Sequence, residues 1–104
     1  MRVTFTRPAL RDFEKIAETS EREFGAAVAV ELESLFRLSL DRIGAMPEIG
    51  GDVVGRPGVY SLPLVRYPFR IYYHLVTGAV EILHVRHTSR RNIKNVFGKS
   101  RIGR

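Results

Sequence analysis

Residues 69–87, FRIYYHLVTGAVEILHVRH, decide the fold, because they carry the plainest β-hairpin pattern in the chain. The segment 69–76 is rich in aromatic and β-branched side chains, which favour strands. Thr77 and Gly78 supply a turn, and a second strand is predicted over 80–87. A small sheet of this kind needs a second layer to cover its apolar face, and the rest of the chain is expected to provide that layer.

The two predicted strands separate an apolar side from a polar side, because successive side chains of a strand point to opposite faces. On the first strand, strict alternation puts one set of side chains on the apolar side and the other on the polar side. The apolar set is Phe69, Ile71, Tyr73 and Leu75, and the other is Arg70, Tyr72 and His74. On the second strand, strict alternation puts His84 and Arg86 on the side of Ile82, so a bulge there would change the assignment. We expect the apolar side to face the helices and the open side to present Arg70, Tyr72, His74, His84 and Arg86.

Two further strands are predicted upstream of this hairpin. Residues 59–65 form one of them, and Pro63 within it has no N–H for a ladder, so it belongs at an edge, at a bulge or with its nitrogen facing outward. The glycine- and proline-rich segment 55–58 breaks the chain before this strand. At the N-terminus, residues 2–6 alternate between apolar and polar side chains, which is typical of a short strand.

Between these strands the apolar period changes to that of a helix. Pro8 marks the first turn of a helix that is expected to end at Gly25. A second helix is predicted over 26–45, and Pro47 follows its end. Because the link between the two helices is very short, they should pack as an antiparallel hairpin.

The predicted order is strand, helix, helix, strand, strand, strand, within one domain that spans residues 1–104. This is an α+β fold, with a helical hairpin packed on one face of a small, mostly antiparallel sheet. A basic tail occupies about residues 90–104. Within it Ile93, Val96 and Phe97 recur at helical spacing, which favours a short C-terminal helix.

The net charge of +6 is unevenly distributed along the chain. Residues 1–50 carry seven basic and nine acidic side chains, whereas residues 51–104 carry ten basic and two acidic ones. The second half should therefore attract nucleic acid or an acidic partner. The alternative is that the charge serves only solubility.

The chain has no cysteine, which excludes disulfides, thiolate metal sites and a cysteine nucleophile. An intracellular, cytoplasmic protein is the simplest interpretation, since no apolar run is long enough to span a bilayer and no signal peptide is present. The histidines do not suggest a metal site, because His84 and His87 should point to opposite faces and no carboxylate joins them at ligand spacing. No cofactor is expected.

A set of short segments, in their order and spacing, resembles the RelE/ParE superfamily of toxins from bacterial type II toxin–antitoxin systems. The resemblance covers roughly residues 2–92, and its segments are TRPALRDF (6–13), MPEIGG (46–51), GVYSLPL (58–64), RYPFRIYY (66–73) and ILHVRHTSRR (82–91). It implies the α+β fold already predicted, and it implies a toxin neutralised by a small acidic antitoxin, similar to ParD, in a hetero-oligomeric complex.

The superfamily has two main branches, one of DNA gyrase inhibitors and one of ribosome-dependent mRNA endoribonucleases. Metal-independent RNA cleavage needs a base, an acid and cations for the charged phosphorane. Nuclease-branch toxins place basic residues on the strand before the Arg-x-x-Tyr segment, but this chain has neither Lys nor Arg between Arg56 and Arg66. The segment at Arg66 and the last strand look more like the ParE branch, so the resemblance favours gyrase inhibition without catalysis.

Two alternatives remain open at this point. A ribosome-dependent mRNA endoribonuclease would use Arg70, Arg86 and His87 as its catalytic residues. A non-toxic, basic nucleic-acid-binding module is suggested by charge alone, although the chain has no helix-turn-helix, zinc-finger, RRM or KH signature.

Two sets of binding residues are predicted. The candidates for binding the target, gyrase or else the ribosome with its mRNA, are Arg66, Arg70, Tyr72, His84, Arg86, Arg90 and Arg91. The candidates for binding the antitoxin are Phe13, Leu32, Phe36, Tyr60, Ile93 and Phe97.

Overall fold

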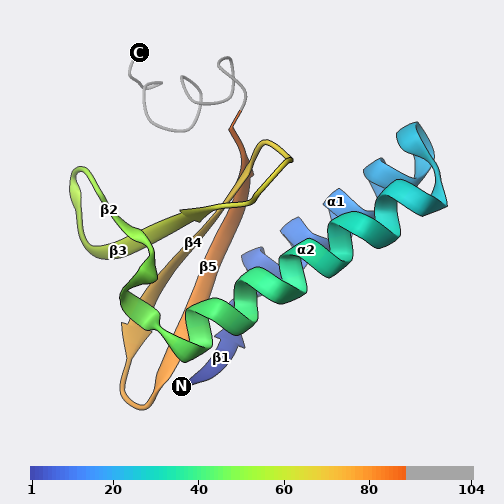
Figure 1. The fold of residues 1–104 in the computed structure, drawn as a ribbon. Helices are drawn as coiled ribbons and strands as arrows, with labels where there is room; N and C mark the ends of the chain where they lie inside the picture. The colour runs from blue at the N-terminus through green and yellow to red at the C-terminus, as the bar shows by residue number, and fades with distance from the viewer. Residues whose placement is uncertain (89–104) are drawn as a thin grey trace.

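A computed structural model describes residues 1–88, which form two helices packed on one face of a five-stranded sheet (Figure 1). The strands are β1 (Arg2–Phe5), β2 (Gly51–Val53), β3 (Arg56–Pro63), β4 (Phe69–Val76) and β5 (Ala79–His87). The helices are α1 (Arg7–Phe24) and α2 (Ala26–Ala45), followed by a 3₁₀ turn, η1 (Pro47–Ile49). The predicted C-terminal helix or tail lies outside the described residues.

The helical hairpin forms as its sequence predicts. The Thr6 hydroxyl caps α1 by accepting the Ala9 N–H at 3.2 Å, and Pro8 occupies the first turn, where its missing N–H has no cost. Gly25 joins the helices with a φ of 93°, a conformation that glycine adopts without strain. In Figure 1 the two helices run side by side, and their far end at this turn extends beyond the sheet.

The strand order is β1-β5-β4-β3-β2, with β1 parallel to β5 and the other pairs antiparallel. The fold is thus α+β and its sheet is mostly antiparallel, as predicted. One part of the prediction is wrong: β3 begins at Arg56, rather than at residue 59, and ends at Pro63. The cause is Gly55, whose φ of 81° turns the chain tightly, so that β3 starts at once and pairs with the short, unpredicted β2.

A β-bulge decides which β5 side chains face the helices. Tyr72 pairs with His84, but the next residue, Tyr73, pairs with Ile82, so Leu83 is the extra residue. The bulge puts Ile82 on the helix side while His84 stays on the opposite side. The face of the sheet away from the helices is called the open face below.

The core lies between the hairpin and the sheet. Its largest completely buried side chains come from α2, β4 and β5, namely Ile43, Ile71, Tyr73, Val80 and Ile82. Tyr73 is satisfied within this core, because its hydroxyl donates to the Pro47 carbonyl at 2.8 Å and accepts the Gly50 N–H at 2.9 Å. These bonds hold η1 against the sheet. Among residues 1–88, neither helix is both long and apolar enough to cross a membrane.

Candidate functional site

Four of the predicted target-binding residues meet on the open face. The sheet register places Arg70 opposite Arg86 and Tyr72 opposite His84, on the adjacent strands β4 and β5. Directly opposed side chains of an antiparallel pair lie on the same face and close together. Arg70, Tyr72, His84 and Arg86 are called the open-face cluster below.

Asp12 of α1 binds two members of the open-face cluster. Its carboxylate accepts the Arg86 Nη1 at 3.2 Å and lies 3.3 Å from His84 Nδ1. The same Oδ2 atom also accepts the backbone N–H of Val85 at 3.0 Å, beyond the point where β1 stops pairing with β5. Asp12 was not among the predicted site residues, because its position in the helix is an ordinary polar one in the sequence.

Arg70 and Tyr72 have different environments. The Arg70 Nη1 donates to the Ser61 hydroxyl on β3 at 2.6 Å. Tyr72 is only 8% exposed, and burial raises the pKa of its phenol, an effect that Arg70 and Arg86 oppose. The Tyr72 hydroxyl is therefore protonated at neutral pH. At the other end of the open face, His74 Nε2 lies 2.7 Å from a carboxylate oxygen of Glu81.

His87 is not in the open-face cluster. It pairs with Phe69 on the helix side of the sheet, and its ring contacts the Phe69 ring edge-on at a centroid distance of 5.1 Å. The three candidate catalytic residues are consequently split, since Arg70 and Arg86 lie on one face and His87 lies on the other.

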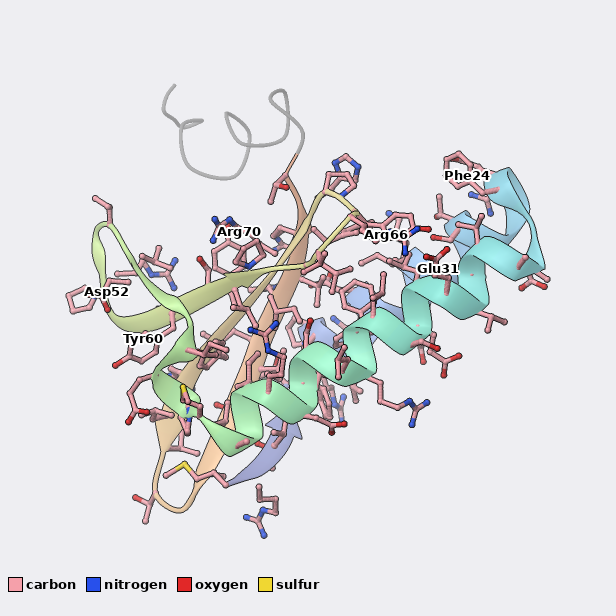
Figure 2. The ribbon with its side chains drawn as sticks, viewed as in Figure 1. Phe24, Glu31, Asp52, Tyr60, Arg66 and Arg70 are labelled. Atoms are coloured by element: carbon pink, nitrogen blue, oxygen red, sulfur yellow. The ribbon has the colours of Figure 1, made fainter. Side chains whose placement is uncertain are left out.

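Arg66 also lies apart from the cluster, in the loop between β3 and β4. Its Nη1 forms an ion pair with Glu31 of α2 at 2.8 Å, and the neighbouring Tyr67 hydroxyl donates to the other Glu31 oxygen at 3.0 Å. That hydrogen bond raises the pKa of Tyr67, and burial and the Glu31 charge add to the rise. Figure 2 shows Arg66 beside Glu31 and away from Arg70. Arg90 and Arg91 lie outside the described residues.

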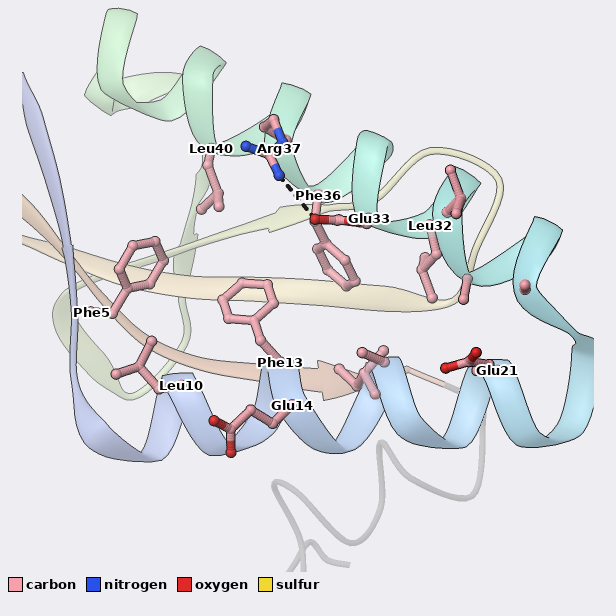
Figure 3. Close-up of a pocket in the computed structure, with 15 residues that line it drawn as sticks. Phe5, Leu10, Phe13, Glu14, Glu21, Leu32, Glu33, Phe36, Arg37 and Leu40 are labelled. Carbon is pink, nitrogen blue, oxygen red and sulfur yellow. Dashed lines mark hydrogen bonds and ion pairs between the residues drawn. The ribbon is translucent and has the colours of Figure 1, made fainter.

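The predicted antitoxin-binding residues Phe13, Leu32 and Phe36 line a second feature, an apolar groove between the two helices (Figure 3). This interhelical groove has a volume of about 660 Å³. Phe13 packs edge-on against Phe36, with ring centroids 5.1 Å apart, and against Phe5 on its other side. Leu32 and Phe36 are nearly buried, so they form its floor, whereas Leu10 at 49% exposure stands at its rim.

The other antitoxin candidates do not line this groove. Tyr60 lies on β3, where its ring stacks on Tyr73 at 5.6 Å beside η1. Ile93 and Phe97 are outside the described residues. Across residues 1–88, no three His, Asp or Glu side chains gather in a way that would hold a metal ion.

Comparison with solved structures shows which known proteins share this fold. The fold matches toxins of bacterial toxin–antitoxin systems: the chromosomal ParDE system of P. aeruginosa has a TM-score of 0.75 at 21% identity, covering 86% of this chain and 97% of the other. The E. coli RelBE complex has a TM-score of 0.58 at 21% identity, with coverages of 86% and 98%. The isolated E. coli RelE toxin has a TM-score of 0.59 at 19% identity, with coverages of 92% and 98%. No curated protein matches the sequence.

The family itself is established by sequence. Residues 3–92 match the model of the ParE toxin of the type II toxin–antitoxin system parDE. The chain therefore belongs to the ParE toxin family, and it is a toxin of the type II class.

Proposed function

We propose that this toxin inhibits DNA gyrase in the cytoplasm, as the ParE resemblance implies, and that a cognate acidic antitoxin similar to ParD neutralises it. The family match supports the ParE branch, as does the higher TM-score with the ParDE structure than with the two RelE structures. The open-face cluster provides the target-binding surface.

The observation that carries this proposal is the way the open-face cations are paired. RNA cleavage needs a general base near the 2′-hydroxyl and cations directed at the phosphate. Here Arg86 and His84 share the Asp12 carboxylate, Arg70 is bonded to Ser61, and His87 lies on the other face of the sheet. This arrangement suits docking of a protein surface better than acid–base chemistry on RNA.

Two assays on the purified toxin distinguish the targets. With gyrase and a relaxed plasmid, we expect loss of supercoiling or accumulation of cleaved DNA. With translating ribosomes, we expect no codon-dependent mRNA cuts. Arg70→Ala should weaken the gyrase effect, whereas Arg37→Ala, which removes an exposed arginine of α2 that pairs with Glu33, should not. Ribosome-dependent cuts with unchanged supercoiling would overturn the proposal in favour of the nuclease.

Toxicity in cells is the second expected property. Expression without antitoxin should stop growth, and co-expression with the small acidic protein encoded beside the toxin should restore it. Normal growth at a high yield of folded toxin would contradict a toxic activity for this chain.

The interhelical groove is proposed to hold apolar anchors of the antitoxin. A segment that is disordered when free and folds on the toxin can fill such a groove while its acidic residues meet the basic half of the chain. Leu10→Ser at the groove rim should weaken antitoxin binding about tenfold. The matched control is Leu38→Ser, a similarly exposed leucine on α2 that does not line the groove.

Salt dependence tests the apolar character of this contact. If apolar anchors dominate the complex, raising salt should slow association far more than it speeds dissociation. Stopped-flow and surface-binding kinetics measure the two rates. A dissociation rate that rises by orders of magnitude with an unchanged association rate would show that charge supplies most of the affinity.

A further inference from the structure

A second groove lies at the far half of the helical hairpin, where the hairpin meets the β3–β4 loop. It has a volume of about 560 Å³, and its apolar lining includes Ile16, Phe24, Val28, Pro68 and Phe69. Phe24 at the hairpin end is 66% exposed, a large apolar surface for a residue beside a groove. This hollow is called the loop-side groove below. It shares Ile16 and Leu32 with the interhelical groove, and its other lining residues belong to neither proposed binding surface.

The wall of the loop-side groove is already formed in the folded chain. Arg66 and Tyr67 both bind Glu31 of α2, so the loop that carries Tyr67 and Pro68 is held against the hairpin. Arg66 adopts a φ of 79°, which is costly for a residue other than glycine and is maintained by these contacts. A preformed groove binds an occupant without the further cost of ordering its own wall.

The described chain ends at the rim of this groove. His87, the last residue of β5, lines it, and the next residue, Thr88, donates its N–H to the carbonyl of Pro68 at 2.7 Å. Figure 1 shows the end of β5 beside the β3–β4 loop. Residues 89–104 therefore start next to the groove, and the five residue-to-residue steps from Thr88 to Ile93 can span up to about 17 Å.

The chemistry of residues 89–104 fits the groove. Ile93, Val96 and Phe97 recur at the spacing of one helical face, and the same sixteen residues carry six basic and no acidic side chains. On the hairpin side, residues 18–23 of α1 hold three acidic side chains and one basic side chain. The groove lining itself contains one acidic residue, Glu23, and one basic residue, Lys15. The apolar stripe complements the apolar groove lining, and the net negative charge of residues 18–23 complements the basic flanks of the stripe.

We propose that the loop-side groove is the intramolecular docking site of residues 89–104, which bind it through Ile93, Val96 and Phe97. The inference is independent of gyrase inhibition, because it concerns the free chain alone. A second copy of the chain, or a segment of another protein, is the competing occupant.

A spin label tests the proposal on the full chain. The protein has no cysteine, so Ser100→Cys creates a single attachment point for a nitroxide. We expect the amide signals of Thr19, Glu23 and Val28 to lose most of their intensity, whereas that of Ser61 on the open side of β3 keeps it. Retained intensity at the three groove positions would overturn the proposal.

Two controls identify the occupant. Adding Ile93→Asp and Phe97→Asp to the labelled chain should restore the groove signals, whereas Ile102→Asp, which lies outside the apolar stripe of Ile93, Val96 and Phe97, should not. Mixing the labelled chain with an isotope-labelled chain that lacks the cysteine should leave the groove signals of the latter unchanged. Broadening of the groove signals in the mixture would show that a second copy fills the groove. Restoration of those signals by Ile102→Asp would show that charge alone attracts the tail. Either result overturns the proposal.

Discussion

The two faces of the sheet are built from the same strands but are stabilised in opposite ways. On the helix side, Ile71, Tyr73 and Ile82 are completely buried against the hairpin, and apolar burial is the main stabilising contribution. On the open side, Arg70, His84 and Arg86 are held by polar partners, Ser61 for Arg70 and Asp12 for the other two. The helix side therefore fixes the fold, whereas the open side presents charged groups and contributes less to the free energy of unfolding. Mutations on the two faces should accordingly differ in their effects on stability.

The largest effect should come from the helix side. Ile82→Ala should lower the free energy of unfolding by about 2–5 kcal/mol, because the cavity lies in a fully buried site between strand and helices. Urea unfolding followed by circular dichroism measures this loss, and the dependence on urea concentration should stay unchanged. A loss well below that range would mean that the two faces contribute more equally than proposed.

A smaller loss is expected for Tyr73→Phe. The substitution keeps the ring but leaves the Gly50 N–H and the Pro47 carbonyl without their partner, at a cost of about 1–3 kcal/mol. Thermal or urea unfolding at neutral pH measures it. Tyr60→Phe, which keeps the ring that stacks on Tyr73, is the matched control and should change stability less.

The pH dependence of the wild type follows from the same tyrosine. Burial raises the pKa of Tyr73 above its ordinary value of 10, an effect that the Gly50 N–H opposes. Because the unfolded phenol ionises first, this contribution to stability is complete below pH 10 and is lost as the pH rises through the folded-state pKa. Tyr73→Phe should reduce the fall in stability above pH 10 without abolishing it, since Tyr67 and Tyr72 also have raised pKa values. An unchanged alkaline slope in the variant would contradict this reasoning.

On the open side, Asp12→Ala should cost about 1–2 kcal/mol, because the carboxylate accepts from Val85 and Arg86. A double-mutant cycle with Arg86→Ala isolates the ion pair. The coupling free energy should be smaller than the full cost of Asp12→Ala, because Asp12→Ala also removes the hydrogen bond from the Val85 N–H, which Arg86→Ala leaves intact. Additive effects of the two mutations would show that Asp12 acts only through the strand edge.

The smallest effects on stability are expected for Arg70→Ala and its control, Arg37→Ala. The hydrogen bond from Arg70 to Ser61 lies on the open face, so the loss should be about 1 kcal/mol or less, while binding to the target falls. Arg37→Ala, with an exposed partner at i−4, should cost about 0.3–0.5 kcal/mol and leave target binding unchanged. A loss of several kcal/mol for Arg70→Ala with activity intact would make this arginine structural.

Local patterns in the sequence were enough to predict the helical hairpin and the β4–β5 pair. Thr6, Pro8 and Gly25 act within one or two turns of their own positions, so their effects can be read without the tertiary structure. The three-residue β2 could not be predicted, because so short a strand has no period of its own and depends on pairing with β3.

The candidate site was predictable only in part. Alternation along β4 correctly placed Arg70 and Tyr72 on the same face. The position of the bulge at Leu83 depends on the pairing of β5 with β4, and no pattern within β5 indicates it. The contacts of Asp12 with β5 and of Arg66 with Glu31 join positions 35 or more residues apart. The tertiary structure determines such pairs, and the sequence alone does not show which of the many acidic residues of the helices will form them.

The parallel pairing of β1 with β5 limits how early the sheet can form during synthesis of the chain. Arg2 pairs with Ala79 and Phe5 with Ile82, so β1 cannot pair until β5, the last strand within residues 1–88, has been synthesised. At about 5–20 residues per second, synthesis of a chain of 104 residues takes roughly 5 to 20 seconds. During that interval the nascent chain can form its hairpin of helices, but it cannot close the sheet, because contacts so distant in sequence form last. A toxin built in this order stays unassembled until its synthesis is nearly complete, and prematurely terminated copies lack the strand that carries His84 and Arg86.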